Sequence, residues 1–165
     1  MTFLSDFGLA DEYVAVCKAV IRGIAPGAEI ADISHLIRPF GVREGALVLA
    51  ASVGWFPDAV HLAVVDPGVG SARRALVLQA GGSHLVGPDN GLLLPAAERL
   101  GGVRAAFEVS NPDLGTAGRS RTFHGRDVFA PAAAHLRNGV APAQFGPELA
   151  VDSLASLPAP VAEFF

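Results

Sequence analysis

The hydrophobic positions of this chain follow two periods in alternation, one typical of buried strands and one typical of amphipathic helices. Short apolar runs at residues 1–5, 28–33 and 59–65 predict strands, and the last run is almost wholly apolar, as in a strand buried on both faces. Between these runs, residues 11–24 and 41–56 place their apolar side chains on one stripe, which predicts helices.

The second half of the chain continues the alternation with shorter elements. Apolar residues at 75–79 and 84–86 flank Gly81-Gly82 and predict two strands joined by a turn. The remaining expected elements are a helix over 90–100, a strand over 104–109 and an alanine-rich helix over 127–136. Residues 140–165 are proline-rich and weakly patterned.

Alternating strands and helices are typical of a layered α/β domain with a largely parallel sheet. We therefore predict that residues 1–150 form a three-layer α/β/α, Rossmann-like domain. Sites in such sheets form beyond the carboxyl ends of the strands, so residues that follow strands are the first candidates for chemistry. We expect residues 151–165 to be a linker or the start of a second domain that this chain lacks.

Composition narrows the classes of function. The chain has 165 residues, of which 51% are hydrophobic, and this is enough for one domain with a core. Its net charge is −4 and its basic residues are scattered, which argues against a nucleic-acid partner. The single cysteine, Cys17, is expected to be a buried, inert thiol, as fits a reducing cytoplasm. No signal peptide is expected, because the first residues contain no basic segment and Asp6 follows closely. No membrane span is expected, because no apolar run reaches roughly 18 residues.

One acid stands directly after the third predicted strand, within a glycine-rich turn. Asp66 lies in the run Val64-Val65-Asp66-Pro67-Gly68-Val69-Gly70, and Arg73 follows seven residues later. Asp-Pro-Gly alone is ordinary turn chemistry. The run resembles a phosphate-binding loop, but Gly-x-Gly-x-x-Gly is absent and no Lys-Ser/Thr follows, so phosphate binding is disfavoured. The acid, its glycines and the nearby arginines together favour a functional site.

A histidine next to a glycine stands before the last predicted helix. His124 lies in the run Thr122-Phe123-His124-Gly125-Arg126-Asp127. An isolated histidine is more often structural, but a loop histidine with a carboxylate and an arginine within reach can act as a general acid or base. We interpret Asp127 as the helix N-cap and Arg126 as its ion-pair partner. A metal site is disfavoured, because no His-x-x-x-His or cysteine pair accompanies the remaining histidines.

Three other residues are candidates for binding. Asp6 follows the first predicted strand and shortly precedes Gly8, a position suited to hydrogen bonding with both hydroxyls of a ribose. Asp11 either caps the first helix or binds a ligand, and the sequence leaves both readings open. Phe40 ends a loop, where it is either part of the core or an apolar wall for a flat ligand.

Taken in order, these motifs resemble the S-adenosyl-L-methionine (SAM) hydroxide adenosyltransferases, or SAM hydrolases, which are related to the SAM-dependent fluorinases and chlorinases. The resemblance extends from Phe3 to about Pro147. It is carried by five blocks: Ser5-Asp6-Phe7-Gly8 with Asp11 and Tyr13; Asp32-Ile33-Ser34-His35 with Pro39-Phe40; residues 63–70 with Arg73-Arg74; Gly87-Pro88-Asp89-Asn90-Gly91-Leu92; and residues 122–127 with Phe129-Ala130-Pro131-Ala132-Ala133.

The resemblance implies an N-terminal α/β domain followed by a smaller C-terminal β-domain, which we expect to be absent from this chain. It implies a homotrimer with the active site at a subunit interface, and SAM as a substrate with no separate cofactor or metal. Asp66, Arg73 and His124 match the trio that handles the attacking water. The implied substrate-binding positions are Asp6 at the ribose, Asp11 near the methionine amino group, Phe40 beside the nucleoside, and Phe123 and Gly125 on either side of His124.

The resemblance also bears on which nucleophile is used. The fluorinase has tyrosine in place of Asp66 and a halide-contacting serine in place of Gly125, although a chlorinase can carry glycine there. A carboxylate repels a halide but polarises water, so we expect hydrolysis of SAM to adenosine and L-methionine by attack at the ribose C5′. We expect Asp66 and His124 to share the role of base, with Arg73 orienting the water and the acid. The alternatives are a SAM halogenase, a non-catalytic nucleoside-binding module and a structural trimerisation domain.

Overall fold

The computed structural model of the chain describes residues 1–118 and 120–158. Within them, seven strands form one sheet in the order β2-β1-β3-β5-β4-β6-β7. The strands are β1 (Thr2–Ser5), β2 (Ala31–Ser34), β3 (Val60–Val64), β4 (Ala75–Ala80), β5 (Ser83–Pro88), β6 (Val103–Glu108) and β7 (Glu148–Leu149). The α-helices are α1 (Tyr13–Ile24), α2 (Val42–Val53), α3 (Leu94–Arg99) and α4 (Ala130–Arg137). The predicted second-domain opening falls partly on residues 159–165, which lie outside the described residues.

The sheet is mixed, with most of its strands in one direction. β1 pairs in parallel with β2 and β3, and β3 pairs in parallel with β5. β4 is antiparallel to both of its neighbours, β5 and β6, and β7 is antiparallel to β6. The largely parallel sheet predicted from the alternation therefore holds on the β2-to-β5 side. The antiparallel part begins at the β4–β5 hairpin, where Gly81 has the positive φ of 57° that suits a tight turn.

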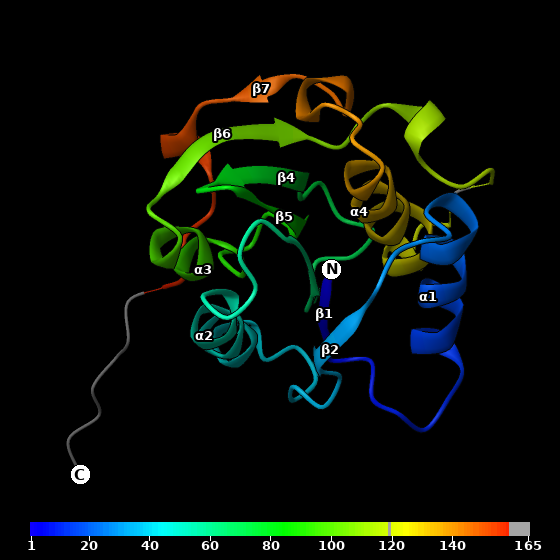
Figure 1. The fold of residues 1–165 in the computed structure, drawn as a ribbon. Helices are drawn as coiled ribbons and strands as arrows, with labels where there is room; N and C mark the ends of the chain where they lie inside the picture. The colour runs from blue at the N-terminus through cyan, green and yellow to red at the C-terminus, as the bar shows by residue number, and fades with distance from the viewer. Residues whose placement is uncertain (119, 159–165) are drawn as a thin grey trace, which may run out of the picture.

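Helices lie on both faces of the sheet (Figure 1). Successive strand residues point to opposite faces, and in β1 they enter different buried clusters. Phe3 packs in the cluster that holds Cys17 of α1 and Ala132 of α4. Leu4 packs in the other cluster, with Leu49 of α2. Figure 1 shows α1 and α4 together on one side of the sheet and α2 and α3 on the other.

Two predicted helices differ from the observed ones at their first turns. α3 begins at Leu94 rather than at residue 90, because the side chain of Asn90 bonds the Val65 carbonyl and accepts the Leu92 amide, holding the segment in a turn. The helix predicted over 127–136 begins earlier, with a π-helical turn over Gly125–Phe129 that runs into α4. Such π turns occur often at functional sites.

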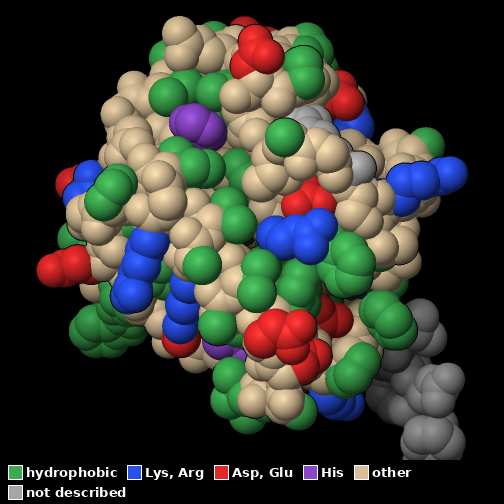
Figure 2. All heavy atoms as spheres, turned by 90° about the vertical axis from the view of Figure 1, so that its right-hand side faces the viewer, with side chains coloured by type: hydrophobic (Ala, Val, Ile, Leu, Met, Phe, Trp, Pro, Cys, Tyr) green, Lys and Arg blue, Asp and Glu red, His purple; other side chains and the backbone are tan. Residues whose placement is uncertain are grey.

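The buried cysteine, the surface and the helix lengths can each be compared with what the composition predicts. Cys17 is buried, as predicted, and burial raises the pKa of its thiol to about 12. Figure 2 looks onto the α1 side of the molecule, where hydrophobic side chains reach the surface between interspersed acidic and basic ones. In the described part of the chain, the helices are too short or too polar to cross a membrane.

Candidate active site

The two acids that follow strands meet at one edge of the sheet. β1 and β3 are parallel neighbours, and Ser5 at the end of β1 is in register with Val64 at the end of β3. Asp6 and Asp66 each come just beyond these positions. The carboxyl ends of adjacent parallel strands thus bring them to the same edge, as the strand pattern predicts.

Asp66, Arg73 and His124 form one hydrogen-bonded group. Arg73 Nε lies 3.0 Å from each carboxylate oxygen of Asp66, and Arg73 Nη2 also donates to Asp66 Oδ2. The same Nη2 lies 2.8 Å from His124 Nδ1. The side chains of Asp66 and Arg73 are only 6% and 10% exposed, so this ion pair is largely shielded from water. One guanidinium therefore joins Asp66 to His124, which lies 51 positions beyond Arg73 in the chain.

Phe129 supports this group from beneath. Its fully buried ring lies 5.1 Å from the Arg73 guanidinium carbon, within cation–π range. The His124 ring meets the same phenyl ring edge-on at 6.5 Å. Phe129 ends the π turn and His124 immediately precedes it, so this one turn sets both the imidazole and the surface on which the guanidinium rests.

A cavity of about 300 Å³ opens beside Asp66. It contains four of the predicted substrate-binding residues, Asp6, Phe40, Phe123 and Gly125. Its other lining residues, which the sequence did not single out as binding residues, are Phe7, Tyr13, Pro39, Val64, Val69 and Thr122. Most of these residues lie within a few positions of a predicted site residue, and this closeness in sequence is the feature that could have indicated them. The volume suits a small organic ligand.

The aromatic wall of the cavity leaves no room for a side chain at Gly125. A Cβ placed there would lie 2.8 Å from Phe7 Cζ and 3.0 Å from the Tyr13 hydroxyl. Phe7 and Tyr13 pack edge to face at 4.6 Å, and burial raises the pKa of Tyr13 to about 12. Tyr13 therefore stays neutral and accepts the Arg126 amide at 3.2 Å, which ties the π turn to α1.

Asp6 holds a strained aromatic residue at the rim of the cavity. Its Oδ2 accepts the backbone amide of Phe40 at 2.8 Å. Phe40 has a φ of 63°, a left-handed conformation that costs a non-glycine residue about 1–2 kcal/mol. Phe40 is 68% exposed, so it belongs to the rim of the cavity rather than to the core. Backbone strain of this kind is concentrated at functional sites.

Other predicted residues have structural partners. Asp11 does not line the cavity; its Oδ1 accepts the Tyr13 amide at 3.0 Å, at the start of α1. Arg74 is bound by Asp89, with Nε 2.8 Å from Oδ2. Asp32 contacts Lys18 and His35, with distances of 2.5 and 3.1 Å.

Asp127 is not the helix N-cap that the sequence suggested. It lies within the π turn, and its carboxylate accepts the Thr116 hydroxyl at 2.9 Å and the Ser120 amide at 2.8 Å. The predicted ion pair with Arg126 is present, with Arg126 Nε 2.7 Å from Oδ1. The Arg126 contact, together with these hydrogen bonds, lowers the pKa of the buried Asp127 carboxyl to about 2. The carboxylate thus fastens the preceding loop to the π turn.

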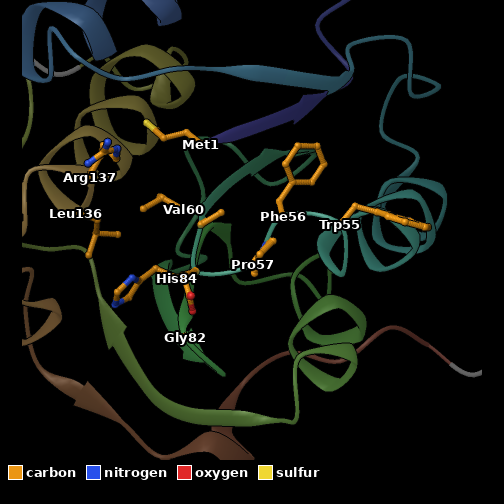
Figure 3. A pocket seen from close by; sticks show the side chains of 11 residues that line it. Met1, Trp55, Phe56, Pro57, Val60, Gly82, His84, Leu136 and Arg137 are labelled. Atoms are coloured by element: carbon orange, nitrogen blue, oxygen red, sulfur yellow. The ribbon is translucent and has the colours of Figure 1, made fainter.

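A larger cavity, of about 650 Å³, lies at the amino ends of β1 and β3, where Met1 and Val60 line it (Figure 3). It also contains an acid, an imidazole and a guanidinium, from Asp58, His84 and Arg137. No hydrogen bond or ion pair joins these three among the described residues, whereas the trio at Asp66 is fully connected. The connected and shielded group beside the smaller cavity is therefore the better candidate for catalysis.

Comparisons with known proteins identify the relatives of the chain. A family model of the SAM hydroxide adenosyltransferase N-terminal domain matches residues 1–146. An (R)-S-adenosyl-L-methionine hydrolase from Salinispora arenicola is 55% identical over 163 residues, which cover 99% of this chain and 62% of that protein. A fluorinase from Actinoplanes sp. is more distant, at 30% identity over 97% of this chain and 61% of its own length.

A solved structure agrees with these matches. An uncharacterized conserved protein from Thermotoga maritima aligns with a TM-score of 0.89 at 45% identity, over 95% of this chain and 60% of that one. The chain therefore spans about three fifths of the length of the relatives that it matches, from 60% to 62% in these three comparisons.

Proposed function

The chain belongs to the SAM hydroxide adenosyltransferase family, and on that basis we propose that it hydrolyses S-adenosyl-L-methionine to adenosine and L-methionine. The observation that carries the proposal is the carboxylate of Asp66, held by Arg73 on the wall of a ligand-sized cavity that also contains Asp6 and the exposed ring of Phe40. The hydrolase name of the 55% identical relative supports the choice of reaction.

The reaction is a displacement at the ribose C5′. Water attacks this carbon opposite the sulfur, the new C5′–O bond forms, and the C5′–S bond breaks with its electron pair passing to sulfur. The sulfonium leaves as the neutral thioether of methionine, so no acid has to protonate it. One water proton is released in each turnover. The protein must therefore align the water, exclude competing solvent and accept a proton, and alignment alone can supply roughly 7–11 kcal/mol.

The residues take roles that follow from their positions. Asp66 faces the cavity and carries a negative charge, which attracts and polarises water. Arg73 fixes the carboxylate through two donors and stays charged, because a guanidinium does not lose its proton in proteins. Asp6 retains Oδ1 for ribose hydroxyls while Oδ2 binds the Phe40 amide. Phe40 and Phe123 supply aromatic surface for the nucleoside, and Gly125 lets Phe7 and Tyr13 close the wall.

Product analysis separates this proposal from its alternatives. The protein is incubated with SAM, with and without chloride, and the nucleoside products are separated by chromatography. A hydrolase forms adenosine at the same rate in both samples. Formation of 5′-chloro-5′-deoxyadenosine would identify a halogenase instead. Binding of adenosine in a calorimeter without any turnover of SAM would identify a nucleoside-binding module and overturn the proposal.

We also infer a three-layer, Rossmann-like architecture and a homotrimer with the site at a subunit interface. The helices on both faces of the sheet support the first inference. Exposed apolar side chains support the second, because Phe40 and Phe123 at the cavity are 68% and 47% exposed, and Leu9 and Leu36 are 64% and 67% exposed. Analytical ultracentrifugation tests the trimer, and a monomer at micromolar concentration would contradict it.

A further inference from the structure

We propose that His124 is a positioning residue rather than the base: it accepts a hydrogen bond from Arg73 at Nδ1, carries its own proton on Nε2, and so holds the guanidinium against Asp66. Asp66 is then the group that takes the proton from water. The assignment of the base rests on the proposed hydrolysis of SAM, whereas the assignment of the imidazole tautomer rests on hydrogen bonding alone.

The contact between Arg73 and His124 fixes the direction of the hydrogen bond. Arg73 Nη2 lies 2.8 Å from His124 Nδ1, a normal distance for an N–H donor and an imidazole acceptor. A guanidinium has five donors and no acceptor. Nδ1 must therefore offer its lone pair, and in a neutral imidazole the proton then belongs to Nε2.

The donors of Nη2 are fully used by this arrangement. This nitrogen carries two hydrogens, of which one goes to Asp66 Oδ2 and the other to His124 Nδ1. A proton on Nδ1 would set two donors against each other next to a permanent positive charge. Taking the proton from water at Nδ1 would thus break the contact that orients Arg73.

The positions of the three side chains agree with this division of labour. Asp66 lines the cavity of about 300 Å³, whereas Arg73 and His124 line a separate recess of about 170 Å³. Both the guanidinium and the imidazole rest on the buried ring of Phe129. The imidazole therefore contacts the guanidinium from the side of the recess, and Asp66 is the trio member that lines the ligand-sized cavity.

The reaction balances without a proton on His124. As the water oxygen bonds to C5′, one water O–H bond breaks and its proton passes to a carboxylate oxygen of Asp66. The electron pair of the C5′–S bond passes to sulfur. The proton leaves Asp66 for solvent after the products depart, and both His124 and Arg73 keep their protonation state throughout.

Two substitutions of His124 distinguish a role in positioning Arg73 from a role in proton transfer. In His124→Asn, the side-chain Oδ1 occupies nearly the place of Nδ1 and still accepts from Arg73, but it cannot act as a base. We expect kcat within about threefold of the parent for His124→Asn and a loss of about tenfold or more for His124→Ala. If His124 were the base, both variants would lose about 10²–10⁴-fold, and this result would overturn the proposal.

A spectroscopic measurement tests the tautomer in the unmodified chain and needs no turnover. Nitrogen-15 NMR of histidine-labelled protein, assigned by the signals missing in His124→Asn, should show an unprotonated Nδ1 and a protonated Nε2 at neutral pH. A protonated Nδ1 would overturn the proposal. If the tautomer is as expected but SAM is not hydrolysed, the proposed function is wrong, whereas the hydrogen bond by which His124 positions Arg73 is confirmed. If SAM is hydrolysed and Nδ1 is protonated, only this inference fails.

Discussion

At the scale of single residues, the site depends on conformations and close approaches that ordinary side chains resist. Phe40 adopts a left-handed backbone held by Asp6, and Gly125 lies where any Cβ would meet the ring of Phe7. Both features place aromatic surface at the cavity. The hydrogen bond to Asp6 holds Phe40 in its strained conformation, and such strain is concentrated at functional sites.

Two glycine-to-alanine substitutions test how closely Phe7 and Tyr13 pack against Gly125. Gly125→Ala should lower the free energy of unfolding by about 1–3 kcal/mol, because the new methyl group overlaps Phe7 and Tyr13. The matched control is Gly23→Ala in α1, where nothing lies within 4 Å of the added Cβ. That change should stabilise the helix by about 0.5–1 kcal/mol. Urea unfolding of both variants checks this, and equal effects would contradict the proposed packing.

At the scale of elements, the central strands carry a buried histidine that links folding to pH. His61 of β3 is fully buried, and its Nδ1 lies 2.8 Å from the hydroxyl of Thr2 in β1. Its Nε2 meets no hydrogen-bond partner among the described residues. Burial, and then the positive N-terminal amine, lower the pKa of His61 from 6.5 to about 4. The folded state therefore binds this proton less readily than the unfolded state.

Stability should consequently fall as the pH drops from 6.5 to 4. The full contribution of neutral His61 is present above pH 6.5 and is lost as the unfolded state takes up a proton, with a total change of about 3 kcal/mol. Burial lowers the pKa of His84 and His135 as well, which adds a slope of the same sign. Urea unfolding across this range checks the prediction. His61→Asn retains a partner for Thr2 and should flatten the slope; an unchanged slope would contradict the role of His61.

The elements themselves were largely predictable, and the exceptions have physical causes. The apolar runs of β1 and β3 and the stripe of α1 carry strong periodicity, so the sequence indicates both their type and their place. The start of α3 differs from the prediction because the side chain of Asn90 competes with the helix for backbone groups. The π turn at Gly125–Phe129 has no period of its own in sequence, since its extra residue per turn appears only through packing.

At the scale of the whole molecule, the sheet brings the reacting groups together from distant parts of the chain. The predicted trio could be named from motifs, because each member lies within three positions of a glycine near the end of an element. The hydrogen bonds among the trio could not, because they depend on how the turn after β3 meets the turn before α4. The same holds for Asp127, whose buried carboxylate binds a loop rather than capping a helix.

The most direct test of the central claim is the fate of the water oxygen. The protein is incubated with SAM in water enriched in oxygen-18, and the adenosine formed is analysed by mass spectrometry. We predict one heavy oxygen in the 5′ hydroxyl of each adenosine, and a loss of about 10²–10⁴-fold in rate for Asp66→Asn, which keeps the shape of the side chain but removes the charge. Adenosine formed at the parental rate by Asp66→Asn, or without heavy oxygen, would contradict the account.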